Sequence, residues 1–469
     1  MNYPFWVVPH IGSGWVIGII AIFHVMISQF AVGGGMYLYF AERKALKEGR
    51  RDWLKMIKSH SRFFLILTSV FGTVSGVGIW FAIGLAAPEA TSTLIHNFVF
   101  GWAIEWVFFL VELSTVIVYY YTWDKISDEL HLKVGLLYAI SSLFTLIIIN
   151  GILTFKLTPG ASWLSAAGTG REASMFWEAF FNPTYWPSLF LRLGVCFSLA
   201  GVWALISYSR MGHEDEKLRS ELVRWSAQWL LPLFFAMPFL LFWFLHQMPV
   251  SQRGLLELGI STIGKGAFTQ VTRTVLVIVM TSITIVGVVY FFAWRSPMDF
   301  KQSHAVAILL LGLCATASSE YVREMLRKPY IIVGHMYSNG VRLAAVDKFN
   351  AEGFLAHSLW VASGPDEHLG KGQAMFRGQC MSCHTIDTYR AMKKLLGGRD
   401  RDAMGNLVKM LHEDKPDSPY HAFMPKIVGT PEELDDLRDY LLTLIPKETA
   451  DPEPQTVSAA PAQTPVTQP

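Results

Sequence analysis

Eight long apolar stretches constrain this chain more than any other feature of its sequence. Each holds about 20 or more mostly hydrophobic residues, which is the length that a helix needs to cross a hydrocarbon core of ~30 Å. They lie at approximately 12–40, 62–86, 97–122, 132–156, 186–208, 227–250, 270–294 and 305–326. Only 16% of the residues are charged, against roughly 25% in a typical soluble domain. We therefore predict an all-α, polytopic membrane bundle over residues 1–330 and exclude a soluble multidomain enzyme.

Basic residues in the loops predict the orientation of this bundle. The first loop is strongly basic, with Arg43, Lys44, Lys47, Arg50, Arg51, Lys55, Lys58 and Arg62, whereas the next loop, 88–97, has no Lys or Arg. Because basic loops stay in the cytoplasm, the first loop is expected inside and both termini outside. The first span has neither a basic leader nor a small-residue cleavage site, so we expect a retained helix rather than a signal peptide. A net charge of +2 gives no indication of nucleic-acid binding.

A short motif near the C-terminus carries the most specific chemistry. Residues 380–384 read Cys-Met-Ser-Cys-His, the pattern of covalent c-type haem attachment. Cys380 and Cys383 would form the two thioethers, and His384 would be the proximal iron ligand. A redox dithiol or half of a zinc site are the disfavoured alternatives. Since c-type haem is attached on the outer side of bacterial energy-transducing membranes, the motif agrees with the loop charges and predicts a periplasmic domain on an inner-membrane protein.

The residues after this motif resemble the end of a small class I cytochrome c. Met424 in a Met-Pro pair is the expected distal ligand, with His421 and Met410 as fallbacks, and Met/His ligation favours a relatively high potential. We therefore divide the rest of the chain into a periplasmic linker (331–365), a cytochrome c domain with one haem c (366–446) and a disordered Pro/Ala-rich tail (447–469).

Several ionisable residues fall inside the predicted spans, where such groups are costly and are functional candidates. They are His24, Glu105, Glu112, Arg192, Arg273 and Glu320. Counting along the helices places both arginines, Glu105 and Glu320 in the outer half of the membrane, with His24 nearer the middle. Simpler interpretations exist: His24 could be a hydrogen-bonded core residue, and an arginine near a helix end can extend toward water.

Five segments, taken together, resemble cytochrome bd quinol oxidase subunit I. They are FHVMISQFAVGGG with His24 and Gly33, GTVSGVGIWFAIG with Gly72, Gly76, Phe81 and Gly84, GWAIEWVFFLVELST, NPTYWP and LRKPYIIVG. The resemblance implies that His24 binds a high-spin haem and that Glu105 and Glu112 line a proton route. It also implies haem b or d, and quinone, as cofactors. A structural alternative is that the two glutamates bond to Arg192, Arg273 or haem propionates.

The sequence departs from that family where the low-spin haem b should bind. The family's His after the NP segment falls on Leu191, the later Met falls near Val275, and the quinol loop is reduced to about twenty residues. We therefore expect a respiratory electron-transfer subunit that links a membrane haem or quinone site to periplasmic carriers through its c haem. A cytochrome c-fed oxygen reductase is the alternative, and a haem-poor membrane anchor for the cytochrome c domain in a larger respiratory complex is a third. Expected partners are membrane lipid, other complex subunits, periplasmic electron carriers and quinone.

Overall fold

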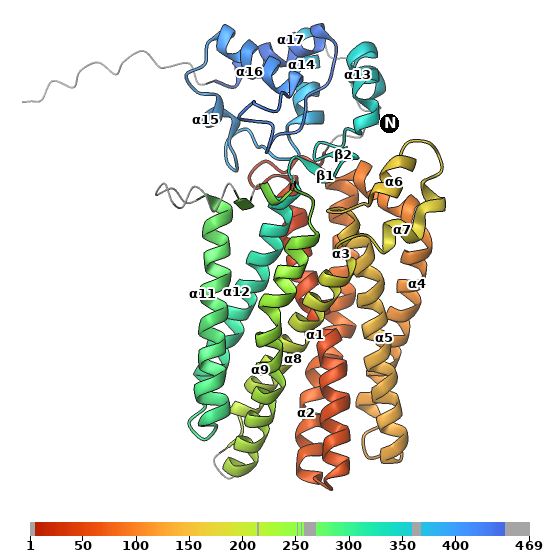
Figure 1. Ribbon diagram of the computed structural model, residues 1–469, viewed down its shortest axis with the longest axis vertical. Helices are drawn as coiled ribbons and strands as arrows, with labels where there is room; N and C mark the ends of the chain where they lie inside the picture. The colour runs from red at the N-terminus through yellow and green to blue at the C-terminus, as the bar shows by residue number, and fades with distance from the viewer. Residues whose placement is uncertain are drawn as a thin grey trace, which may run out of the picture.

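The computed structural model describes residues 5–212, 215–250, 252–254, 256–257, 269–358 and 367–445. Within these described residues, eight helical segments are long and apolar enough to span a membrane, and they lie side by side in one bundle (Figure 1). They are α1 (Ser13–Lys47), α2 (Arg51–Ile66) continued by η1 (Leu67–Gly72) and α3 (Thr73–Ala86), α4 (Pro88–Tyr121), α5 (Asp128–Phe155), α8 (Tyr185–Ser209), α9 (Glu216–Gln247), α11 (Gln270–Val288) continued by η4 (Val289–Arg295), and α12 (Gln302–Leu326). The predicted polytopic all-α fold is confirmed. Most of the shortened quinol loop lies outside the described residues.

Helix α1 is packed closely on three sides through three consecutive glycines. A Cβ at Gly33 would lie 1.9 Å from the carbonyl oxygen of Cys196 on α8, and one at Gly34 would lie 2.2 Å from the Phe64 ring on α2. A Cβ at Gly35 would lie 3.1 Å from the Cα of Ala139 on α5. Side chains at these positions would push the helices apart, so the glycine run holds α1 at the centre of the bundle.

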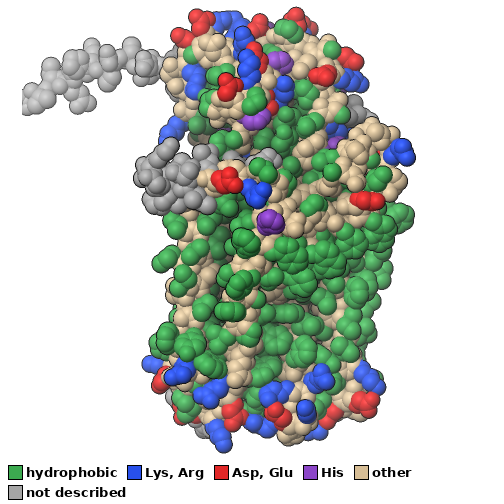
Figure 2. All heavy atoms as spheres, in the orientation of Figure 1, with side chains coloured by type: hydrophobic (Ala, Val, Ile, Leu, Met, Phe, Trp, Pro, Cys, Tyr) green, Lys and Arg blue, Asp and Glu red, His purple; other side chains and the backbone are tan. Residues whose placement is uncertain are grey.

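The two ends of the bundle differ in composition. Figure 2 shows a belt of hydrophobic side chains around its middle, with charged side chains gathered at one end and on the C-terminal domain at the other. We call the first the inner end, because it carries the basic loop that follows α1. The end that meets the C-terminal domain is the outer end.

The segment predicted to be a linker is folded over its described part. It contains β1 (Tyr330–Ile332) paired with β2 (Met336–Tyr337), η5 (Leu343–Ala345), α13 (Val346–Glu352) and η6 (Leu355–His357). The backbone N–H groups of Phe354 and Leu355 each donate to the carboxylate of Glu433, at 2.8 Å. These charge-assisted bonds attach the segment to the C-terminal domain, and the division at residues 331–365 stays a prediction.

The C-terminal domain is built from α14 (Glu367–Gln379), α15 (Met392–Leu396), α16 (Arg401–Glu413) and α17 (Pro431–Thr443). Helices α14 and α17 cross closely, because a Cβ at Gly372 would lie 2.1 Å from the carbonyl oxygen of Asp436. Thr430 and Glu433 form a capping box that begins α17. The predicted tail, 447–469, lies outside the described residues.

Candidate functional site

The Cys-Met-Ser-Cys-His motif begins where α14 ends. The backbone N–H groups of Cys383 and His384 both donate to the carbonyl oxygen of Cys380, at 3.2 and 3.1 Å. The His384 ring donates from Nδ1 to the carbonyl oxygen of Arg390 at 3.0 Å, which leaves Nε2 with its lone pair. A histidine that binds a metal through one ring nitrogen usually donates the N–H of the other to a carbonyl or carboxylate, which fixes the tautomer and the orientation of the ring. The three side chains therefore fit a covalently attached haem.

Met424 lies in the loop between α16 and α17, and its side chain is partly buried. Its backbone N–H donates to the carbonyl oxygen of Tyr420 at 2.9 Å. The two fallback ligands differ in their surroundings. Met410 is exposed on α16, whereas His421 is bonded through Nδ1 to Asp414 at 2.8 Å, an arrangement that leaves Nε2 available to a metal. Met424 stays the prediction for the distal ligand, with His421 as the stronger fallback.

The attachment segment lies directly against the outer end of α1. A Cβ at Gly14 would lie 3.1 Å from the carbonyl oxygen of Ser382, inside the Cys380–His384 motif. The rings of Trp15 and Tyr389 meet edge to face, with centroids 5.7 Å apart. Thr388 donates through Oγ1 to the carbonyl oxygen of Pro9 at 3.2 Å. The first turn of α1 thus packs directly against the C-terminal domain.

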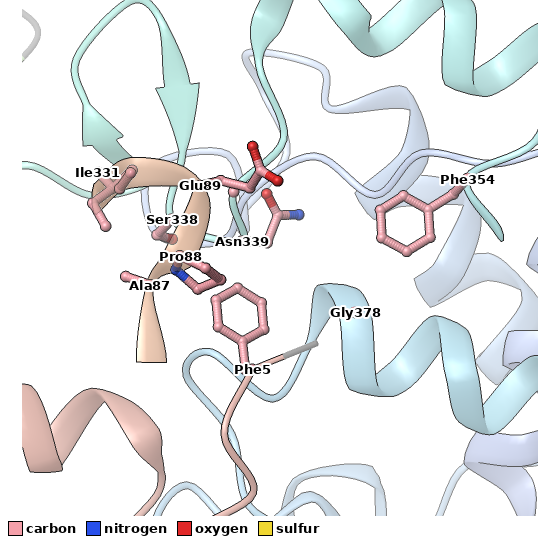
Figure 3. Close-up of a pocket in the computed structure, with 11 residues that line it drawn as sticks. Phe5, Ala87, Pro88, Glu89, Ile331, Ser338, Asn339, Phe354 and Gly378 are labelled. Carbon is pink, nitrogen blue, oxygen red and sulfur yellow. The ribbon is translucent and has the colours of Figure 1, made fainter. Parts of the chain in front are cut away.

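The contact continues at α12 and α4. Nζ of Lys328, just beyond α12, lies 3.7 Å from Sγ of Cys383. The hairpin meets the start of α4 around a cavity of only about 10 Å³, which Figure 3 shows between Phe5, Phe354 and the Ala87–Glu89 turn. That volume holds roughly one water molecule, so the domain is packed closely against the bundle.

His24 lies on α1 ten residues below Gly14, a rise of about 15 Å. Its Nδ1 is 2.9 Å from Oγ of Ser75 on α3. The Ser75 hydroxyl donates to the carbonyl oxygen of Phe71 at 2.5 Å, so it accepts from His24. The imidazole therefore carries its proton on Nδ1 and has a lone pair on Nε2, the form that binds iron. The hydrogen-bonded core role and the haem role are compatible, because they use different ring nitrogens.

Glu105 and Glu112 share one face of α4. Glu112 is only 3% exposed, Glu105 is partly buried, and the two carboxyl groups are close enough to interact electrostatically. The phenol of Tyr138 on α5 also interacts with Glu112. The predicted alternative in which these glutamates bond to Arg192 is not what the structure shows, because Arg192 faces a different carboxylate.

Arg192 and Glu320 do come together near the outer end. Nη1 of Arg192 is 3.7 Å from Oε1 of Glu320, whose other oxygen pairs with Arg323 at 2.7 Å. Arg327 pairs with Glu324 one turn further along. Arg273 is exposed on α11, and its place in this cluster stays a prediction. The direction in which a side chain points from a helix depends on packing that spacing alone does not supply.

Sequence reasoning missed three groups at these sites. Ser75 orients His24, Lys328 reaches Cys383, and Lys156 follows α5 beside the arginine cluster. No motif in the sequence around Ser75 or Lys156 predicts a role for either residue. Lys328 stood inside a recognised segment, but its contact is 55 residues away in the chain.

Comparison with known proteins agrees with this arrangement. A sequence model of cytochrome bd terminal oxidase subunit I matches residues 13–247, half of the chain, including His24, Glu105, Glu112 and Arg192. This chain belongs to the cytochrome bd terminal oxidase subunit I family. The bd oxidase structure from Geobacillus thermodenitrificans has the same fold, with a TM-score of 0.59 and 14% identity, over 70% of this chain and 90% of that one. None of the curated proteins compared matches the chain.

Membership of the bd oxidase family makes this chain a respiratory, multi-pass membrane subunit. The family implies haem b or d and quinone-related binding. The matched region ends at residue 247, so it does not include the Cys380–His384 motif or the domain that surrounds it.

Proposed function

We propose that this bd-family subunit exchanges electrons between a membrane haem or quinone site and periplasmic carriers, through a covalent haem c at Cys380 and Cys383. His384 and Met424 would be the axial ligands of that haem, and His24 would hold a non-covalent haem b or d. When bound, these groups supply one-electron transfer. Periplasmic carriers would bind the cytochrome-like domain. Other respiratory subunits would pack against the sides of the bundle that lipid does not contact.

The observation that carries this proposal is the contact between the haem motif and α1. Ser382 touches Gly14, and ten helical residues separate Gly14 from His24, which is about 15 Å. One continuous helix therefore connects the two predicted haem sites. Trp15 and Tyr389 fill the space beside this contact with aromatic rings.

A second candidate function is a cytochrome c-fed oxygen reductase, and one observation favours it. Leu191 stands where the family has a ligand of its quinol-side low-spin haem, and the neighbouring Arg192 is used in an ion pair with Glu320. Leu191 has no atom that can bind iron, and the Arg192 guanidinium is already paired with a carboxylate. Electrons from the outer domain would then have His24 as their nearest predicted acceptor site in the bundle.

The protein's own residues have separate roles in either version. Ser75 fixes the tautomer and orientation of His24, so that Nε2 would be available to hold a haem iron. Glu105 and Glu112 hold protons near that site and balance the charge that arrives with each electron. Lys328 places a positive charge beside Cys383, which favours the reduced state of the outer haem.

The proposal is tested by replacing Cys383 with Ala and following two signals. Haem staining of the denatured band should disappear, and reduction of the membrane haem by a periplasmic donor should become much slower. Cys314→Ala is the matched control, because Cys314 is an exposed thiol outside the motif and its loss should change neither signal. Retained staining in Cys383→Ala would contradict the haem c assignment. Unchanged reduction of the membrane haem would contradict the electron route.

A further inference from the structure

A buried cluster at the inner end of the bundle is unexplained by the roles above. It consists of Glu42 on α1, Tyr119 on α4 and His131 on α5, which are 1%, 0% and 4% exposed. Tyr119 donates through its hydroxyl to Oε2 of Glu42 at 2.7 Å, and Nδ1 of His131 lies 2.7 Å from Oε1. Nε2 of His131 lies 2.9 Å from the carbonyl oxygen of Tyr119. Three helices thus meet at one carboxyl group.

Hydrogen-bond accounting shows that His131 and Glu42 share one proton. A carbonyl oxygen can only accept, so Nε2 of His131 carries a hydrogen. The 2.7 Å contact between Nδ1 and Oε1 then needs one proton between two groups that both have lone pairs. Either an imidazolium donates to a carboxylate, or a protonated Glu42 donates to a neutral ring. The two states differ only in the position of that proton.

The cluster lies close to the inner surface, yet is covered. His131 is the fourth residue of α5, and the exposed Asp124 in the preceding turn is near enough to interact with it electrostatically. The ring of Trp123 covers the imidazole, with centroids 4.2 Å apart. Protons from the water at the inner end therefore have a short way to His131, while lipid and bulk water are kept off the pair.

The cluster is also aligned with the two membrane glutamates. Glu105, Glu112 and Tyr119 follow one another at seven-residue intervals on α4, which places them on one face about 10 Å apart. Tyr138 on α5 stands between the last two, since its phenol interacts electrostatically with both Glu112 and Tyr119. Its hydroxyl donates to the carbonyl oxygen of Ala31 on α1 at 3.3 Å. Polar groups thus follow one line from the inner end toward the depth of His24.

We propose that Glu42 and His131 form a proton-loading site that takes protons from water at the inner end and supplies them to Glu112. The proton held between Nδ1 and Oε1 passes toward Glu112 along the face of α4, by way of Tyr119 and Tyr138 or bound water. A proton from the inner aqueous phase then fills the vacant position between Nδ1 and Oε1, while Nε2 keeps its own hydrogen on the Tyr119 carbonyl. The pair has a net charge of zero whether the shared proton lies on His131 or on Glu42. Holding that proton therefore adds no net charge to the interior of the bundle.

A structural clamp is the competing explanation, because the same three bonds also tie α1, α4 and α5 together. The test is therefore the rate of proton uptake from the inner side when the membrane haem is reduced, measured with a pH dye in vesicles that hold the whole chain. Glu42→Gln keeps the shape of the side chain and an oxygen that can accept from Tyr119. Its amide group cannot take up and release the proton that Glu42 shares with His131. We expect its uptake to be at least about tenfold slower, with normal haem content.

Glu129→Gln is the matched control, because Glu129 is an exposed carboxylate two residues from His131 that pairs with Lys133. Its uptake should equal that of the unmodified chain. Tyr119→Phe is the second variant if Glu42→Gln fails to assemble, since it removes only the hydroxyl that donates to Glu42. It should slow uptake partly and retain haem. Normal uptake in either variant would overturn the proton-loading role.

The proposal rests on the proposed function, and the two can fail separately. A chain that binds no non-covalent haem contradicts the proposed function and with it the reaction that this site would serve. A chain that binds and reduces its membrane haem, and takes up protons equally fast with Glu42→Gln, contradicts only the loading site.

Discussion

Nζ of Lys328 lies 3.7 Å from Sγ of Cys383, so a cation from the end of α12 stands against a thioether position of the predicted haem c. Reduction removes one positive charge from a haem, and a nearby cation therefore favours the reduced state. We expect Lys328→Met to lower the midpoint potential of the c haem while haem attachment stays complete. A redox titration of the c-haem absorption band measures this. An unchanged potential would show that Lys328 does not face the haem.

Met424 supplies the second prediction about the outer domain. Met424→Ala should lower the potential of the c haem and remove any weak absorption of Met-ligated ferric haem, because Met/His ligation raises the potential. Met410→Ala is the control, since Met410 is exposed on α16. If Met424→Ala changes nothing, the ligand is His421 or Met410, and the control variant separates those two.

Ser75 and His24 should affect the membrane haem in a graded way. His24→Ala removes the proposed ligand, so it should abolish the b- or d-type signal and leave haem c intact. Ser75→Ala removes only the oxygen that accepts from Nδ1, and losing such a supporting bond typically costs about 10- to 100-fold in affinity. Haem content after mild washing measures both. The assignment fails if His24→Ala retains the full b- or d-type signal.

Glu112 distinguishes a proton route from a structural clamp. Glu112→Gln should slow turnover while the protein stays assembled and haem-loaded, because the amide cannot pass a proton. A structural clamp would instead show lost assembly or lost haem. Should rate, assembly and haem content all remain at the level of the unmodified chain, neither role would apply to Glu112.

His335 makes the outer interface sensitive to acid. It is 8% exposed in the hairpin, and its ring lies 5.0 Å from that of Trp163 on α6 (Ala161–Ala166). Burial lowers its pKa to about 4, below the roughly 6.5 of an unfolded histidine. The unfolded chain therefore binds the extra proton first as the pH falls. The stability contribution is present above about pH 6.5 and is lost between about 6.5 and 4.

Thermal unfolding followed by tryptophan fluorescence tests this pH dependence. The unfolding temperature should fall between pH 7 and pH 4.5, and His335→Gln should flatten that fall. An equal slope in both proteins would assign the acid sensitivity to other groups.

Features set by local composition or by short spacing could be predicted from the sequence. The eight spans are predicted by the length of the apolar stretches. The motif at residues 380–384 is short enough to be recognised without any knowledge of the fold. Contacts between distant segments could not. Glu433 bonds to Phe354 and Leu355 almost 80 residues away, and that contact folds a segment which composition reads as a linker. Arg273 is exposed on α11, and spacing along a helix does not predict such exposure, because helix rotation depends on packing. Glu42 and His131 meet across 89 residues.

The haem inventory of the purified chain tests the central claim most directly. Pyridine haemochrome analysis, with acid-acetone extraction to separate covalent from non-covalent haem, should find one haem c and at least one haem b or d per chain. His24→Ala should lose the extractable haem alone, and Cys383→Ala the covalent haem alone. A chain with haem c and no extractable haem would contradict the account, and would leave the bundle as an anchor for the cytochrome c domain.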